Sequence, residues 1–308
     1  MKKKGLISFV IPAYNESKNI HTLIQEIESN LSLHKLNYEI LIIDDHSSDH
    51  TFEAVKKLRQ PKVNCIRLSR RSGSHIAVRA GLQLAIGEAV ICMSADGQDN
   101  PKAIPQLIKK FKEGYQTVWA IRKKRREPLR IKLLALLFYK LCFFLNNTRS
   151  EFDLANADFY LLSRRVVDTI NQCKENKTSL FALIVWWGFK QTAISYERRD
   201  RQSGQSKWNM RSRLKLAADW IISFSGLPLR FTLFLGLLFS ILGFGFAGTI
   251  IYNVIYGKPV EGWSSLMVAV LVLGGLQLIF LGIVGEYLWK NLEESKKRPF
   301  FSIEDQVR

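Results

Sequence analysis

The chain has 308 residues and a formal net charge of +18. This length allows one large domain or two ordinary ones with a substantial buried core, and the basic balance suits nucleic acid, anionic lipid headgroups or phosphorylated substrates. The four cysteines have no short paired spacing, which excludes a disulfide framework or a CxxC-type zinc site. The first apolar run breaks at Pro12 and Asn15, so we expect no secretory signal peptide.

The first two thirds of the chain alternate short apolar runs with helical stretches. The predicted buried strands are residues 6–11, 38–43, 63–68 and 89–93, and the stretches with apolar residues at helical spacing are 18–31, 51–59, 74–86 and 101–113. This alternation predicts an α/β fold with a parallel sheet wrapped by helices. Ligands bind at the carboxyl ends of such strands, so we expect the chemistry in the loops that follow Ile11, Ile43 and Met93.

The loops after the first two strands carry candidate ligand-binding residues. Pro12, Tyr14 and Glu16 lie in the first loop, although a capped strand-to-helix turn would have the same composition. The second strand ends in Asp44 and Asp45, and carboxylates accept hydrogen bonds strongly from base or ribose groups. Capping of the next helix is the alternative for this loop, and it explains Ser48 or Asp49 better than Asp45.

The loop after the strand at 89–93 supplies oxygen ligands. It contains Ser94, Ala95, Asp96 and Gln98. Hard divalent cations prefer carboxylate and carbonyl oxygens, and Mg²⁺ usually also binds substrate phosphates. Asp96 and Gln98 therefore form the predicted metal site, with a solvated turn as the alternative.

Arginines follow two later strand-like segments. Arg122 and Arg125 come after residues 115–121, and Arg201 comes after residues 191–197. Guanidinium groups bind phosphate through two parallel hydrogen bonds, so these side chains are candidates for contacts with phosphate groups of a substrate. The alternative is a basic face that attracts anionic lipid.

Two apolar stretches near the end, 231–255 and 266–288, are each long enough to cross a bilayer as a helix. Their connection carries only Lys258 and Glu261, whereas basic residues flank the pair on both outer sides, which predicts that both ends face the cytoplasm. The segments 129–145 and 211–222 are amphipathic and could lie at the membrane surface.

Taken together, the motifs FVIPAYNES, IIDDHSSDHT and MSADGQDNP resemble glycosyltransferase family 2, and more narrowly the polyprenyl-phosphate sugar synthases, such as dolichol-phosphate mannose synthase and the bactoprenol glucosyltransferases. The resemblance implies a GT-A (Rossmann-like) catalytic domain. It implies donor contacts from Pro12, Tyr14, Glu16, Asp45, Ser94 and Ala95, and Mg²⁺ or Mn²⁺ on Asp96 and Gln98. The chain departs from the family at Ser94, where the first carboxylate of the metal loop is usual.

Two further segments extend this resemblance. ADFYLLSRRVVD resembles the acceptor-side segment, with Asp158 as its acidic residue, and RQSGQSKW resembles a flexible basic loop that contains Arg201 and Lys207. The residues expected to take part in catalysis are Asp96, Asp158, Arg122, Arg125, Arg201 and Lys207.

The expected organisation is a cytoplasmic GT-A domain at 1–210, an interfacial segment at 211–230, a transmembrane hairpin at 231–290 and a cytoplasmic tail at 291–308. The expected activity is inverting transfer of a hexose, by resemblance glucose, from a nucleotide-diphosphate sugar (UDP-sugar) to undecaprenyl or another polyprenyl phosphate at the plasma membrane. We also expect a homo-oligomer, a flippase and a downstream glycosyltransferase as partners, and no nucleic acid. The alternatives are a processive polysaccharide synthase and a non-enzymatic basic protein that binds lipid or nucleic acid.

Overall fold

The computed structural model describes residues 3–33, 36–122, 159–173, 180–197, 199, 227–256 and 262–307. They belong to two compact units. The sheet unit comprises residues 1–143, 147–208 and 298–308, and the helix-pair unit comprises residues 144–146 and 209–297. Asp158, Arg125, Arg201 and Lys207 lie outside the described residues, as do both predicted amphipathic segments.

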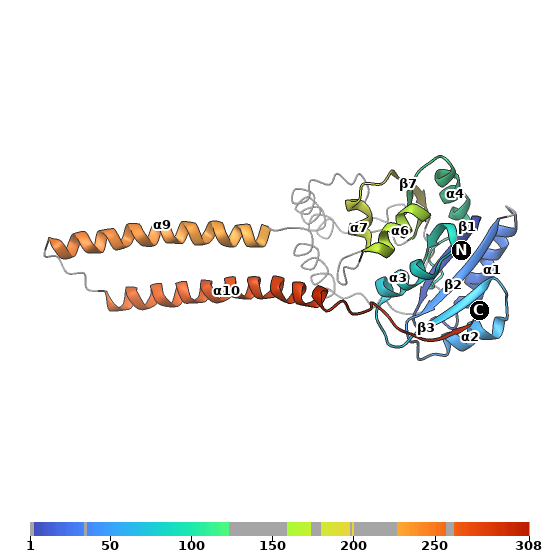
Figure 1. Ribbon diagram of the computed structural model, residues 1–308, viewed down its shortest axis with the longest axis horizontal. Helices are drawn as coiled ribbons and strands as arrows, with labels where there is room; N and C mark the ends of the chain where they lie inside the picture. The colour runs from blue at the N-terminus through green and yellow to red at the C-terminus, as the bar shows by residue number, and fades with distance from the viewer. Residues whose placement is uncertain are drawn as a thin grey trace. The chain divides into compact units, whose positions relative to one another are not determined.

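The sheet unit is built on one eight-stranded sheet with the order β7-β5-β6-β4-β1-β2-β3-β8 (Figure 1). Its strands are β1 (Lys3–Ala13), β2 (Asn37–Asp44), β3 (Val63–Leu68), β4 (Gly87–Cys92), β5 (Thr117–Arg122), β6 (Phe159–Ser163), β7 (Gln191–Tyr196) and β8 (Ile303–Val307). β1 lies in the middle and pairs in parallel with β2 and β4. All four strands predicted from apolar runs are present.

The four predicted strands form the parallel centre of the sheet, and two further strands that the sequence did not predict run antiparallel. β6 runs antiparallel between β4 and β5, and β8 runs antiparallel to β3 at the edge. Both faces of β6 are buried, so its sequence FYLLS is a continuous run that carries no information about strand direction. The sheet is therefore mixed, with a parallel centre.

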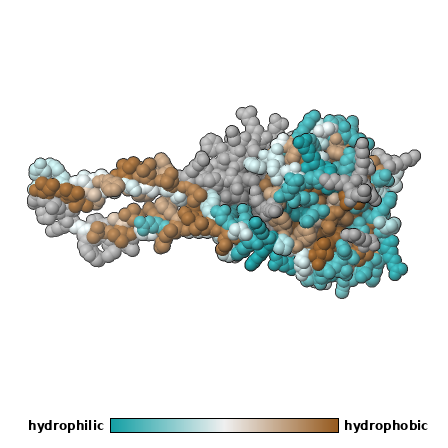
Figure 2. All heavy atoms as spheres, viewed as in Figure 1, coloured by the Kyte–Doolittle hydropathy of each residue, from teal (hydrophilic) through white to brown (hydrophobic). Residues whose placement is uncertain are grey.

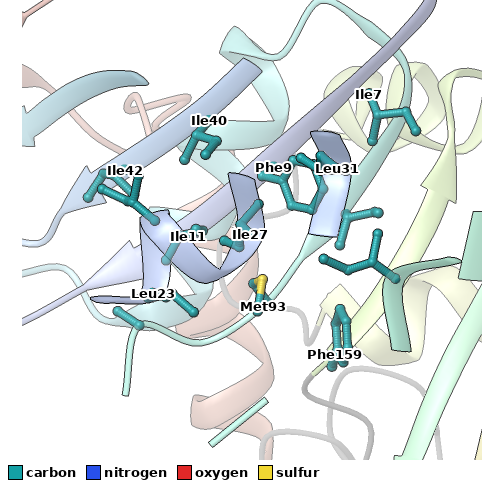
Figure 3. Close-up of a cluster of buried hydrophobic side chains, with 14 of the residues drawn as sticks. Ile7, Phe9, Ile11, Leu23, Ile27, Leu31, Ile40, Ile42, Met93 and Phe159 are labelled. Carbon is teal, nitrogen blue, oxygen red and sulfur yellow. The ribbon is translucent and has the colours of Figure 1, made fainter. Parts of the chain in front are cut away.

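Helices cover both faces of this sheet. On one face, α1 (Ile20–Leu33), α2 (Thr51–Leu58) and α4 (Ile104–Lys112) enclose a core that Figure 3 shows in part, with Phe9 and Ile11 of β1 facing Ile27 of α1. On the other face, α3 (Ser74–Leu84), α6 (Arg164–Gln172) and α7 (Leu180–Trp186) pack over a second core, which includes Val10 and Trp119. The predicted helices at 18–31, 51–59, 74–86 and 101–113 are confirmed, with boundaries shifted by a few residues; the last begins as a short 3₁₀ turn, η1 (Pro101–Ala103).

The helix-pair unit contains two long apolar helices, α9 (Leu227–Ile255) and α10 (Trp263–Ser295). Figure 2 shows apolar side chains along most of both helices, and many of these side chains are exposed, including Leu233 and Phe244. The spans Phe231–Asn253 and Val272–Ser295 are long and apolar enough to cross a membrane. Both stretches predicted from the sequence therefore form helices.

The segment 291–308, which the sequence assigns to a cytoplasmic tail, contains the end of α10 and the edge strand β8. α10 continues to Ser295, and residues 298–308 belong to the sheet unit, where β8 extends the sheet beside β3. Residues 227–230, which the sequence assigns to an interfacial segment, form the first turn of α9.

Candidate functional site

Three polar loops meet at the carboxyl ends of the central strands. The chain leaves β1 toward β2 on one side, whereas β4 pairs with β1 on the other, so the strand order reverses at β1 and β4. Ligands of open α/β sheets bind in the crevice at such a reversal. The loops that follow β1, β2 and β4 are those in which the sequence predicts the chemistry.

The loops after β1 and β2 are joined by hydrogen bonds. The backbone N–H of Asn15 donates to Ser47 Oγ at 2.9 Å, and the Asn15 Oδ1 atom accepts from the backbone N–H of Ser48 at 2.9 Å. The N–H groups of Glu16 and Ser17 donate to Thr51 Oγ1 and Asp49 Oδ2, each at 3.0 Å. The two loops therefore hold each other in one arrangement.

Three non-glycine residues in these loops have a left-handed backbone conformation. Asn15, His46 and His50 have φ angles of 57°, 58° and 62°. Such conformations cost free energy, and they persist where the surrounding contacts fix the chain, often at functional sites. Two of these positions, Asn15 and His46, lie directly beside predicted donor-binding residues.

The predicted donor residues of the first loop are held in different ways. Pro12 lies within β1, in register with Ile43 of β2. The Tyr14 ring carries the Arg71 guanidinium 4.2 Å from its centroid, and the Glu16 carboxylate accepts from Asn19 Nδ2 at 2.7 Å. Arg71, which the sequence reading did not select, therefore places a cation next to the predicted donor site.

The two adjacent aspartates after β2 differ in their surroundings. Asp44 is fully buried, with Oδ1 accepting from the Ser47 N–H at 3.1 Å and Oδ2 lying 3.8 Å from Arg67 Nε. Burial raises the pKa of the Asp44 carboxyl, and the Ser47 hydrogen bonds and Arg67 partly oppose this rise. Asp45 accepts from the backbone N–H groups of Ser72 at 2.6 Å and Gly73 at 2.8 Å, so it fixes the turn that leads into α3.

The alternative predicted for this loop, a helix cap, is met in part: the N-cap residue of α2, His50, makes no side-chain cap hydrogen bond, and the contact comes from its neighbour Asp49. Its Oδ1 atom accepts from the Thr51 N–H at 3.2 Å, at the start of α2. Burial alone would raise the pKa of Asp49, but hydrogen bonds from Thr51 and Ser17 outweigh burial and lower this pKa. Asp49 therefore stabilises the loop as a carboxylate, and Asp45 has no part in that cap.

In the loop after β4, Ser94 lies between two carboxylates. Its hydroxyl is 2.8 Å from Asp96 Oδ1 and 2.7 Å from Asp99 Oδ2, and its N–H donates to Asp99 Oδ2 at 2.8 Å. The Gln98 N–H donates to Asp96 Oδ1 at 3.1 Å, across a turn in which Gly97 has a φ of 72°. The side chain of Ala95 packs in the apolar core, so only its backbone could contact the predicted nucleotide-sugar donor.

Asp99 connects this loop to the neighbouring strands. It is fully buried, and its Oδ1 atom accepts from the Tyr196 hydroxyl at 2.7 Å. Burial raises the pKa of Tyr196, Asp99 raises it further, and the nearby Arg122 guanidinium opposes the rise, so the hydroxyl stays protonated and donates. Arg122 is paired in register with Tyr196 at the ends of β5 and β7, which places this predicted phosphate ligand beside the metal loop.

The structure thus brings four residues of the predicted site together. Ser94, Asp96 and Gln98 contact one another, and Asp99 and Tyr196 link them to Arg122. Asp99 and Tyr196 were missed, although Asp99 follows Gln98 within the same motif. Among the described residues, no group of three or more His, Cys, Asp or Glu side chains is arranged to hold a metal ion by itself. Asp96 is largely buried, with 9% of its surface exposed, and one carboxylate completed by substrate phosphates is a ligand set that Mg²⁺ accepts, so these residues fit the predicted cation.

The chain matches the model of the family described as "Glycosyl transferase family 2" over residues 8–169. It is 39% identical to an uncharacterised glycosyltransferase of Synechocystis sp., with 97% of this chain and 95% of the relative covered. It is 35% identical to the bactoprenol glucosyl transferase of Shigella phage SfV, with 97% and 98% covered.

The fold is similar to that of glucosyl-3-phosphoglycerate synthase from Mycobacterium tuberculosis, with a TM-score of 0.51, 19% identity and coverage of 71% and 80% of the two chains. The family match covers the three loops at the carboxyl ends of β1, β2 and β4, and the relatives match nearly the whole length. From its motifs, its fold and these relatives, the chain belongs to glycosyltransferase family 2 and is a glycosyltransferase.

Proposed function

We propose that this glycosyltransferase moves glucose from a UDP-sugar to undecaprenyl phosphate or another polyprenyl phosphate at the cytoplasmic face of the plasma membrane. The observation that carries the proposal is the cluster of Asp96, Ser94 and Arg122 at the reversal of strand order, in a chain that also has two helices long enough to cross a membrane. Nearly full-length similarity to a bactoprenol glucosyl transferase supports both the lipid acceptor and the choice of glucose.

The donor would lie over the joined loops after β1 and β2. Tyr14 and Glu16 from the first loop and Asp45 from the second would contact the nucleotide, together with Pro12, Ser94 and the backbone of Ala95. Asp96 and Gln98 would hold Mg²⁺ or Mn²⁺. When bound, this cation would neutralise charge on the leaving nucleotide diphosphate.

The acceptor needs no strong base. A phosphate monoester has a second pKa near ~6, so it is largely dianionic at neutral pH and its oxygen can attack the anomeric carbon opposite the leaving group, with inversion. Arg122 would bind phosphate together with Arg125, Arg201 and Lys207. Asp158 would orient the acceptor, so its loss should cost less activity than the loss of Asp96.

The membrane arrangement is also part of the proposal. The charge distribution around α9 and α10 supports a cytoplasmic sheet unit. The lipid-linked sugar would then pass to a flippase and to a downstream glycosyltransferase, and the enzyme would act as a homo-oligomer.

The test incubates membranes that hold the protein with undecaprenyl phosphate and a panel of radiolabelled nucleotide sugars. We expect labelled lipid with UDP-glucose, loss of label with EDTA and its return with Mg²⁺ or Mn²⁺. Asp96→Ala should lower turnover by about 10²-fold or more, because it removes the charged ligand at the leaving group. Asp305→Ala, an exposed aspartate on β8, is the matched control and should retain full turnover. Absence of labelled lipid with every sugar, or full activity of Asp96→Ala, would contradict the proposal.

A further inference from the structure

The C-terminal strand covers the edge of the sheet next to the donor loops. β8 pairs with β3 in the register Arg67↔Asp305 and Leu68↔Ile303, and the Ser69 N–H donates to the Ser302 carbonyl at 2.9 Å. Figure 1 shows this red strand beside β3. Without β8, the outer edge of β3 would present unpaired backbone groups.

Arg67 of β3 lies at the centre of a charged cluster. Its Nε atom is 3.1 Å from Glu304 Oε2 and 3.8 Å from Asp44 Oδ2, and its Nη1 atom is 3.6 Å from Glu53 Oε1. Its Nη2 atom donates to the Ser47 carbonyl at 3.1 Å. One guanidinium therefore connects the C-terminal strand to the loop after β2.

Glu304 also reaches this loop through His46. The His46 Nδ1 atom lies 3.2 Å from Glu304 Oε2 and 3.2 Å from the Leu68 carbonyl. His46 is one of the residues with left-handed backbone, so its side-chain contacts help to hold an unfavourable conformation. His46 and Ser47 directly follow Asp45, the predicted donor carboxylate.

We propose that Glu304 is a positioning residue of the donor site, which holds the loop after β2 in its nucleotide-binding form through Arg67 and His46. Without Glu304, Arg67 would be drawn toward Asp44, whose Oδ2 atom has no hydrogen-bond donor among the described residues. That movement would pull on the Ser47 carbonyl and release the His46 ring. This inference rests on the proposed use of a UDP-sugar.

The exposure of the Glu304 and His46 side chains limits how much their contacts can contribute to nucleotide binding. The Glu304 side chain is 47% exposed and that of His46 42%, and Glu304 and Arg67 line an open groove of about 390 Å³, so solvent screens these pairs. We therefore expect a shift in donor affinity without unfolding. Loss of one such pair corresponds to about fivefold in a binding constant.

The experiment measures UDP binding to the purified full chain by calorimetry in the presence of Mg²⁺, together with KM and kcat for UDP-glucose. Glu304→Ala should weaken UDP binding and raise KM by about fivefold, with kcat changed less than twofold, because it disturbs the loop and spares the reacting groups. Glu304→Gln should recover part of the affinity, since its amide oxygen still accepts from Arg67. Asp305→Ala, on the same strand, should bind UDP like the wild type.

The experiment distinguishes a failure of the proposed function from a failure of the positioning role of Glu304. If the wild-type chain fails to bind UDP, the proposed function fails. If the wild type binds UDP and Glu304→Ala binds it equally well, the positioning role is overturned. If both Glu304 variants lose their folded structure in thermal unfolding, Glu304 serves the stability of the sheet and the positioning role is likewise overturned.

Discussion

Ser94 lies at the start of the predicted metal loop, between the carboxylates of Asp96 and Asp99. Its single hydroxyl hydrogen faces two acceptors, Asp96 Oδ1 and Asp99 Oδ2, and can serve only one of them at a time. Asp99 also receives the Ser94 N–H and the Tyr196 hydroxyl, so both of its oxygens are engaged. The loop therefore keeps two carboxylates: Asp99, which fixes Ser94, and Asp96, the predicted cation ligand, whose Oδ1 atom is itself held by Ser94 and Gln98.

The Tyr196–Asp99 contact gives a test at the scale of one residue. Tyr196→Phe should lower the free energy of unfolding by about 1–3 kcal/mol, because Asp99 Oδ1 would be buried without this donor. Turnover should fall as well, since Asp99 holds Ser94 beside Asp96. Urea titration followed by tryptophan fluorescence measures the first effect, and Tyr115→Phe, at a half-buried tyrosine, is the control. Equal stability of Tyr196→Phe and the wild type would show that Asp99 is held in place by Ser94 alone.

α3 connects the donor loops to the core. Its first residue follows the turn that Asp45 holds, and its other end packs so closely on β1 that a Cβ at Gly81 would overlap the Val10 side chain. Gly81 therefore sets the distance between this helix and the central strand. A shift of α3 would move the turn at Ser72 and Gly73, and with it Asp45.

At the scale of this element, Gly81→Ala should destabilise the sheet unit by about 1–3 kcal/mol through overpacking. Gly275→Ala in α10 is the matched control, because a Cβ there meets nothing within 4 Å. Thermal unfolding of both variants measures the difference. A melting temperature of Gly81→Ala at or above that of the wild type would mean that Val10 yields and that the spacing of α3 is not fixed here.

The whole molecule joins a polar sheet unit and an apolar helix pair in one chain. Basic residues outside the pair and a short, weakly charged connection between its helices predict that the connection is extracytoplasmic. Lys258→Cys should therefore react with an impermeant maleimide on intact cells, whereas Lys297→Cys, beyond α10, should react only after lysis.

Burial raises the pKa of Cys65 and raises that of Cys92 to about 12, so these two native thiols should stay unlabelled. Labelling of Lys258→Cys only after lysis would reverse the assigned orientation.

The sequence by itself determined the local features of this protein. Apolar runs of strand length located β1 to β4, apolar runs of membrane length located α9 and α10, and polar motifs located the loops that carry Asp45 and Asp96. Each of these features depends on neighbouring residues, so a linear pattern contains it. The family followed from the order of the motifs.

Only the tertiary structure decided which distant residues meet. Tyr196 reaches Asp99 across 97 residues, and Glu304 reaches Arg67 across 237, and no local pattern marks either pair. The antiparallel directions of β6 and β8 were equally hidden, because a buried or short strand has the same composition in either direction. Within the predicted tail, Ile303–Val307 forms an edge strand because it pairs with the backbone groups at the outer edge of β3. Such pairing depends on the assembled sheet and not on the local sequence.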